Sequence, residues 1–130
     1  MQASYDVSAQ PERNLILITL AGFFRPDDLA GFDRVRRAAL DRLRCGLNQH
    51  DTIVDVHDLR LQTQAMVEAF RDIIAAPETQ ARRLAIVTGD AAVRMQVRRV
   101  IERDAIRCFA DIGAAEDWLA APAGSWALAG

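Results

Sequence analysis

An unbroken apolar run at residues 83–88, which reads RLAIVT with its one charge at the start, constrains the fold more than any other stretch of the chain. Continuous runs of this kind, without polar alternation, are typical of strands that are covered on both faces, as in parallel sheets. Such strands occur in domains where helices pack on a sheet. The run therefore predicts an α/β architecture.

The remaining pattern fits an alternation of strands and helices. Residues 5–9 alternate and residues 14–21 are rich in β-branched side chains, and the QPER turn between them predicts an antiparallel hairpin. Apolar residues at helical spacing predict the helices. The expected helices cover residues 26–44, 64–75, 90–103 and 113–119, and two further strands cover residues 52–56 and 106–110. The order ββαβαβαβα predicts a mixed sheet with helices packed on it.

Length and charge limit the classes of function. A chain of 130 residues indicates one domain, which we assign to residues 1–120, with residues 121–130 as a flexible tail anchored only by Trp126 and Leu128. The net charge of −2 argues against nucleic-acid binding. All 16 basic residues are arginine, so no lysine is present to form a Schiff base.

The cysteine pattern and hydropathy bear on the compartment. Cys45 and Cys108 lack a CxxC spacing, which predicts two free thiols in a reducing environment. The first residues are too polar for a signal peptide, and no apolar run is long enough to span a bilayer. We therefore expect a cytoplasmic protein without a membrane span.

The strongest candidate for catalysis is the cluster of Asp55, His57 and Asp58 in the third expected strand. Alternation along a strand places Asp55 and His57 on one face and Asp58 on the other, which disfavours a three-ligand metal site. No motif of a nucleophile or a metalloprotease is present. We expect no enzyme activity, no metal and no cofactor.

The loop after this strand carries a single hydroxyl, that of Thr63, just before the next helix. The hydroxyl is expected to cap the helix, and a phosphate on it would also be stabilised by the helix N-terminus. Arg60 is either solvated or paired with an acidic partner, and Asp58 is expected to orient the loop.

Two further positions are unusual for their helices. Arg36 falls within the apolar stripe of the first helix, where it must pair with Asp33 or meet a ligand or second subunit. Met95 is expected to point away from the core face of its helix. The outer face that carries Met95 either is solvated or meets an acidic partner or a membrane. Homodimer formation through Arg36, Met95 or Trp126 is left open. The arginines expected around Met95 are Arg94, Arg98, Arg99 and Arg103.

Four segments in order and spacing resemble the SpoIIAA-like branch of the STAS superfamily, also called STAS/SEC14-like. They read NLILITLAGFFRPDDL, TIVDVHDL, RRLAIVTGD and IRCFADIGAAEDWL. The resemblance implies a four- to five-stranded sheet with helices mainly on one face, and a regulatory module that is not an enzyme. Phosphorylated members related to anti-sigma-factor antagonists have an Asp-Ser pair at the helix start, where this chain has only Thr63.

The SEC14-like side of the family implies an apolar cavity between the first helices and the sheet. Its lining would come from five residues that otherwise form ordinary core: Phe23, Phe24, Phe32, Met66 and Phe70. Two functions are therefore carried forward. The first is a bacterial interaction module that binds an unidentified protein through Asp58, Arg60 and Thr63, and the alternative is a carrier or sensor of a small lipid-like ligand.

Overall fold

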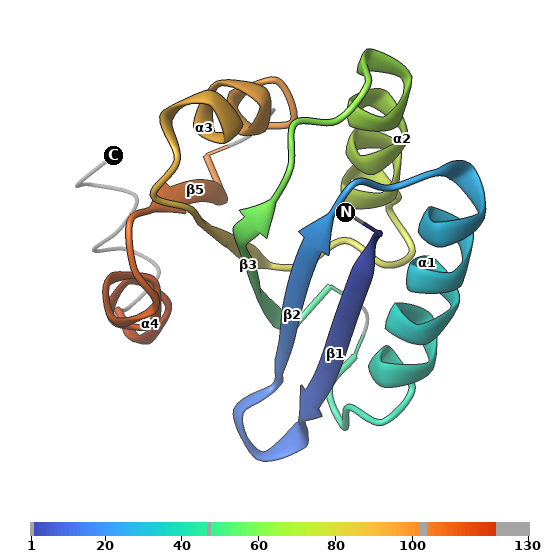
Figure 1. Ribbon diagram of the computed structural model, residues 1–130. Coiled ribbons are helices and arrows are strands. Elements are labelled where there is room, and N and C mark those ends of the chain that lie inside the picture. Colours follow the sequence, from blue (N-terminus) through green and yellow to red (C-terminus); the bar gives the residue numbers. More distant parts are fainter. Residues whose placement is uncertain (1, 47, 102–103, 122–130) are drawn as a thin grey trace.

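The structure is a computed structural model that describes residues 2–46, 48–101 and 104–121 (Figure 1). A single five-stranded sheet has the order β1-β2-β3-β4-β5. The strands are β1 (Ser4–Gln10), β2 (Leu15–Gly22), β3 (Asp51–Leu59), β4 (Arg83–Val87) and β5 (Ile106–Phe109). The helices are α1 (Pro26–Leu40), α2 (Gln64–Ala75), α3 (Ala91–Arg98) and α4 (Ile112–Ala120), with a 3₁₀ turn, Pro11–Arg13, between β1 and β2.

The sheet is mixed because it begins with a hairpin. Strand β1 pairs antiparallel with β2, and the turn between them ends at Asn14, whose φ of 49° is left-handed. All later neighbours, β2–β3, β3–β4 and β4–β5, pair in parallel. The predicted hairpin and strand–helix alternation are confirmed.

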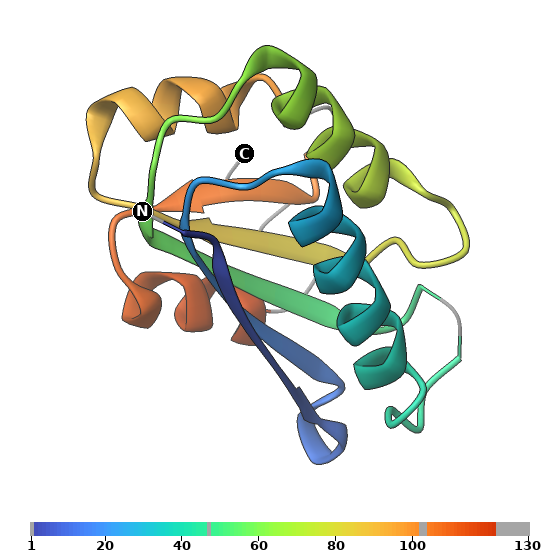
Figure 2. The same ribbon diagram turned by 45° about the vertical axis from the view of Figure 1, so that its right-hand side comes forward.

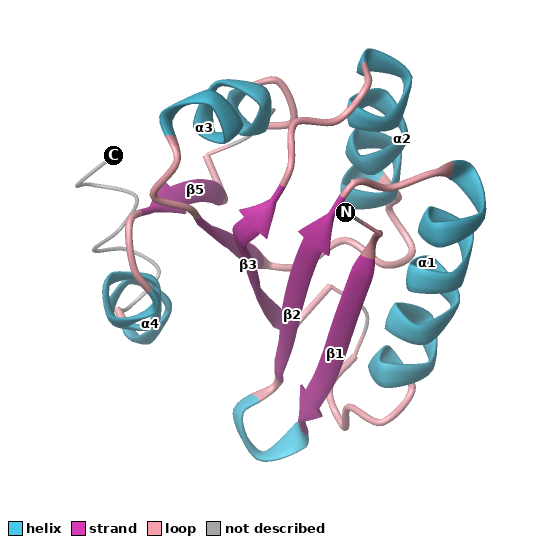
Figure 3. Ribbon diagram, in the orientation of Figure 1, coloured by secondary structure: helices cyan, strands magenta, loops and turns pink. Residues whose placement is uncertain are grey.

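Helices α1, α2 and α3 cover one face of the sheet, and α4 covers the other (Figures 1 and 2). The strand order follows the chain order, so every parallel crossover steps in the same direction across the sheet. Because such crossovers are right-handed, successive crossover helices fall on one face. The expected placement of helices mainly on one face is confirmed, and Figure 3 shows the separation of strands from helices.

Alternate residues of the central strands serve two cores. In β4, Leu84 and Ile86 pack beneath α1–α3, whereas Ala85 and Val87 pack beneath α4 with Trp118. All residues of β4 are buried, which explains why its sequence shows no polar alternation. The inward position expected for Trp118 is confirmed.

Helix ends differ from the expected boundaries. Helix α1 ends at Leu40, because the N–H groups of Arg42 and Leu43 donate to carbonyls three residues back, which tightens the chain out of the helix. Helix α3 ends at Arg98 in a similar tight turn.

Arg103 and the proposed tail anchors Trp126 and Leu128 lie outside the described residues. No helix in the described part of the chain combines the length and apolarity needed to cross a membrane.

Candidate functional site

The loop between β3 and α2 is held by the buried amide of Gln62. Its Oε1 accepts from the Phe24 N–H at 2.9 Å, and its Nε2 donates to the carbonyls of Gly22 at 3.0 Å and Arg60 at 2.6 Å. Gly22 adopts a φ of 82°, a left-handed conformation that glycine tolerates best. Asp58, which was expected to orient this loop, is exposed at the end of β3, and its role remains a prediction.

Helix α3 is joined to the same loop by a second glutamine. The N–H of Gln62 donates to Oε1 of Gln96 at 2.8 Å, and Nε2 of Gln96 donates back to the Gln62 carbonyl at 2.8 Å. The β2–α1 connection, the β3–α2 loop and α3 are therefore joined at one end of the sheet, where Figures 1 and 2 both place them side by side. Neither glutamine stands out in the sequence, because an isolated amide gives no periodic signal.

Three large apolar side chains next to this network are exposed. Phe23 is 38%, Leu61 53% and Met95 68% exposed, and each directly precedes or follows a residue that the network binds. The prediction that Phe23 lines a pocket is wrong for this reason. Exposed arginines flank all three, namely Arg25, Arg60, Arg98 and Arg99. We call Phe23, Leu61 and Met95 with these arginines the contact surface.

Thr63 begins α2 and caps it as expected. Its Oγ1 accepts from the N–H of Met66 at 3.1 Å, and the residue is exposed. The bond satisfies one of the free N–H groups of the first helical turn. Phosphorylation of Thr63 remains a prediction.

Asp55 and His57 form a pair at the end of β3. His57 Nδ1 lies 2.7 Å from Asp55 Oδ1, so the expectation that these side chains share a face is confirmed. The hydrogen bond to Asp55 raises the pKa of His57. Among the described residues, no group of three or more His, Cys, Asp or Glu side chains is placed to hold a metal ion.

The two cysteines are free thiols, as expected, and both are half-buried. Burial raises the pKa of the Cys108 thiol, although Arg94 and Arg98 act in the opposite direction. The thiolate is the reactive form of cysteine, and a raised pKa reduces the fraction of the thiol that is ionised.

An apolar cavity of about 110 Å³ lies between the sheet and α1, α2 and α3. Its walls are mainly aliphatic side chains of β2–β4 and the three helices. Of the predicted lining residues, Phe32 and Phe70 border it. Phe24 and Met66 do not: they are buried in the core outside the lining, where the Phe24 ring packs against Phe70. The polar exceptions in the wall are Arg36, His50, Thr52, Gln62, Thr79 and Gln96.

Arg36 borders the cavity and is buried. Its Nε and Nη2 donate to Asp33 Oδ1 at 3.1 and 2.8 Å, and Nη2 also donates to Thr79 Oγ1 at 3.2 Å. The predicted pairing with Asp33 is confirmed. Partial burial raises the pKa of Asp33, but hydrogen bonds from Arg36 and Arg37 outweigh it and hold the pKa below its usual value.

His50 is the second buried ionisable group in the cavity wall. Burial and, to a smaller extent, Arg36 lower its pKa, against an opposing effect of Asp51. The unfolded chain therefore binds more protons than the folded chain below about pH 6.5, so stability should rise with pH through that range.

Acidification should change the stability of the His50 and His57 variants in opposite directions relative to the wild type. Urea titrations from about pH 7.5 to about pH 5 should show a smaller loss of stability for His50→Gln than for the wild type. His57→Gln should show a larger loss, because the raised pKa of His57 stabilises the fold at low pH and that contribution disappears as pH rises through its folded pKa. Parallel pH profiles for both variants would contradict the assignment.

Comparisons with known proteins identify the fold. No family model matches the chain, and no curated protein matches it. A solved structure of an uncharacterised protein of the DUF3478 family from Shewanella loihica PV-4, which has a SpoIIAA-like fold, matches with a TM-score of 0.61 and 15% sequence identity. The match covers 90% of this chain and 93% of that one. The chain therefore has a SpoIIAA-like fold, as the resemblance of its sequence implied.

Proposed function

We propose that the protein is a non-enzymatic interaction module that binds another protein through the contact surface. The observation that carries the proposal is the exposure of Phe23, Leu61 and Met95 on three segments joined by the Gln62 and Gln96 hydrogen bonds. Exposed aromatic and methionine side chains with arginine are enriched at protein interfaces. The regulatory role that the sequence resemblance implies agrees with this reading.

The partner segment is expected to combine apolar and acidic residues. The arginines beside the three apolar side chains would attract carboxylates, and Arg60 lies next to Leu61 in the loop itself. Asp58 and Thr63 border the same loop, so both fall within reach of a bound partner. Their position in the sequence next to Leu61 supports the proposal that they take part in the contact.

Site-specific photo-cross-linking in cells tests this function. A benzophenone side chain at position 61 should give a discrete product with another protein, and Arg60→Glu should abolish that product. The control carries the benzophenone at Ile112, an exposed apolar residue at the start of α4 on the opposite face of the sheet. Equal products from positions 61 and 112, or no effect of Arg60→Glu, would refute the proposed surface.

Variants at Thr63 should distinguish its effect on the stability of the fold from its effect on partner binding. Thr63→Ala should lose about 1 kcal/mol of unfolding free energy with the cap, whereas Thr63→Ser and Thr63→Asp should retain stability because both side chains can cap a helix. Thr63→Asp also adds a negative charge, as a phosphate would, and should weaken contact with an acidic partner. Urea denaturation and the yield of the product from position 61 measure the two effects. A cross-link yield unchanged in folded Thr63→Asp would contradict the regulatory role.

A carrier or sensor of a small apolar ligand is the second candidate function. The observation that favours it is the cavity of about 110 Å³ beneath α1–α3. For scale, an engineered apolar cavity of about 150 Å³ in another protein binds benzene. A small apolar ligand bound in this cavity would stabilise the native state by mass action.

A further inference from the structure

Strand β1 has an open outer edge. It pairs with β2 on one side and with no other strand of the described part of the chain. In Figure 1, β1 lies in front of the other strands and no helix crosses it. Its seven residues pair with β2 without a register shift. The backbone N–H and C=O groups that point outward along β1 can therefore pair with a further strand.

The sequence of β1 lacks the features that usually protect an edge strand. Natural proteins guard such strands with lysine or other charges, with proline, with a bulge or by keeping them very short. Strand β1, which reads SYDVSAQ, has a single charge, that of Asp6, and no proline. The opposite edge strand, β5, has only four residues, and one of them is Arg107. Of the two edges, β1 is therefore the one suited to pair with another strand.

Exposed apolar side chains lie beside this edge. Tyr5 of β1 is 37% exposed and Val35 of α1 is 41% exposed. Tyr5 packs against α1 at Gly31, where an added Cβ atom would lie only 2.5 Å from the Tyr5 hydroxyl oxygen. From Gly31 to Val35 the helix advances about 6 Å, and from Tyr5 to Val7 the strand advances about 7 Å. Because α1 and β1 run in the same direction (Figure 1), Val35 lies at about the level of Val7.

A second copy of β1 matches this edge in one register. With β1 antiparallel to its copy and Val7 on the two-fold axis, all seven residues of the strand have a partner. Asp6 then faces Ser8, so no like charges are opposed. Tyr5 faces Ala9, so a large side chain meets a small one. Registers centred on Asp6 or Ser8 pair fewer residues, and the first of them opposes two carboxylates.

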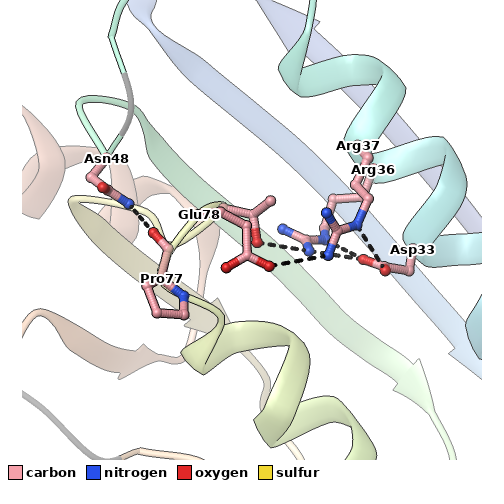
Figure 4. Close-up of polar contacts among 7 residues, drawn as sticks. Asp33, Arg36, Arg37, Asn48, Pro77 and Glu78 are labelled. Carbon is pink, nitrogen blue, oxygen red and sulfur yellow. Dashed lines mark hydrogen bonds and ion pairs between the residues drawn. The ribbon is translucent and has the colours of Figure 1, made fainter.

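The charges on α1 suit the same two-fold arrangement. The axis reverses α1 as well, so the two copies of α1 run antiparallel with Val35 of each near the axis. Asp28 and the exposed Arg42 lie about two helical turns on either side of Val35. The carboxylate of one copy therefore lies opposite the guanidinium of the other, which favours association. Asp33 and the two arginines that bind it lie on the other side of α1, toward the connection from α2 to β4 (Figure 4).

We propose that the protein forms a two-fold symmetric dimer in which β1 pairs antiparallel with β1 of a second copy. The two sheets join into one continuous sheet, and the exposed side chains of Tyr5 and Val35 are covered at the same interface. Two-fold dimers are the commonest soluble oligomers, since one surface serves both copies. The contact surface is carried by other segments, so the dimer presents two of them. This inference goes beyond the proposed function and does not depend on it.

Disulfide cross-linking at the two-fold axis tests the register. In the full chain with both free thiols removed by Cys45→Ser and Cys108→Ser, the substitution Val7→Cys places two thiols opposite each other. Paired residues of antiparallel strands have Cα atoms about 4.5–5.5 Å apart, a separation that a disulfide spans. Oxidation with copper–phenanthroline should give a covalent dimer on a denaturing gel. The control, Thr19→Cys on β2, should stay monomeric because one further strand separates it from the axis on each side. Equal cross-linking of both variants, or none of Val7→Cys, would overturn the register.

Charge changes at Ser8 test the dimer without a cross-link. Ser8 is exposed, and in the proposed register it faces Asp6 of the other copy. Sedimentation equilibrium should show a dimer for the wild type. Ser8→Asp should raise the dissociation constant about tenfold and Ser8→Lys should lower it, because each change acts twice across the axis. Ala114→Asp, at an exposed position of α4, is the control and should leave the dissociation constant unchanged. A monomeric wild type, or a dissociation constant that does not move in opposite directions for the two Ser8 variants, would refute the β1 dimer.

Discussion

Replacement of Arg83 by methionine is expected to lower the free energy of unfolding by about 3–5 kcal/mol, because it removes one partner of a buried ion pair. Arg83 is 4% exposed, and its Nη2 donates to Asp51 Oδ2 at 3.2 Å. The same guanidinium donates to the carbonyls of Leu119 at 2.6 Å and Ala121 at 2.9 Å. Loss of the side chain leaves the final carbonyls of α4 without their donor and leaves the buried Asp51 carboxylate paired only with the half-exposed Arg82.

Arg82→Met is the matched control for this effect. Arg82 binds the same carboxylate, at 3.0 Å from Nη2 to Asp51 Oδ2, but its side chain is 53% exposed. Exposed ion pairs contribute up to about 1 kcal/mol, so Arg82→Met should cost far less. Arg83→Lys should fall between the two, because one ammonium cannot reproduce the planar fork of donors. Urea denaturation that gives equal losses for Arg82→Met and Arg83→Met would contradict the assigned role.

Patterns of hydrophobicity predicted the sheet and its helices because the buried side chains of a strand or a helix recur with the repeat of that element. The run at residues 83–88 indicated a strand covered on both faces, and β4 is buried throughout. The apolar stripe of α1 was equally informative, and even its exception, Arg36, was correctly paired with Asp33. Such features depend on neighbours a few residues apart, which the sequence itself places together.

The polar networks could not be predicted in the same way, because their members are distant in sequence. Gln62 binds Phe24 and Gln96, which lie 38 and 34 residues away. Arg83 was noted only as the charged start of a strand, and its role at the end of α4 depends on how that helix crosses to the other face. The cavity was predicted with five aromatic or methionine side chains, whereas only Phe32 and Phe70 border it. The positions of large apolar residues in the sequence do not specify where packing leaves a space.

Replacement of Gln62 by leucine is expected to lower the free energy of unfolding by about 3 kcal/mol, because a buried polar group left without a partner costs about 1–3 kcal/mol. Leucine is similar in size, so the change leaves little empty space. It does leave the Phe24 N–H and the Gly22 and Arg60 carbonyls without the side chain that binds them. Urea denaturation measures the loss.

Gln64→Leu is the control, because Gln64 is exposed two residues further along the chain and its replacement should change stability by no more than about 0.5 kcal/mol. The Gln62 network also positions the segments that carry Phe23, Leu61 and Met95. Under conditions where Gln62→Leu remains folded, the photo-cross-linked product from position 61 should therefore fall, while Gln64→Leu leaves it unchanged. A stable Gln62→Leu variant with full cross-linking would show that neither the fold nor the contact surface depends on this amide.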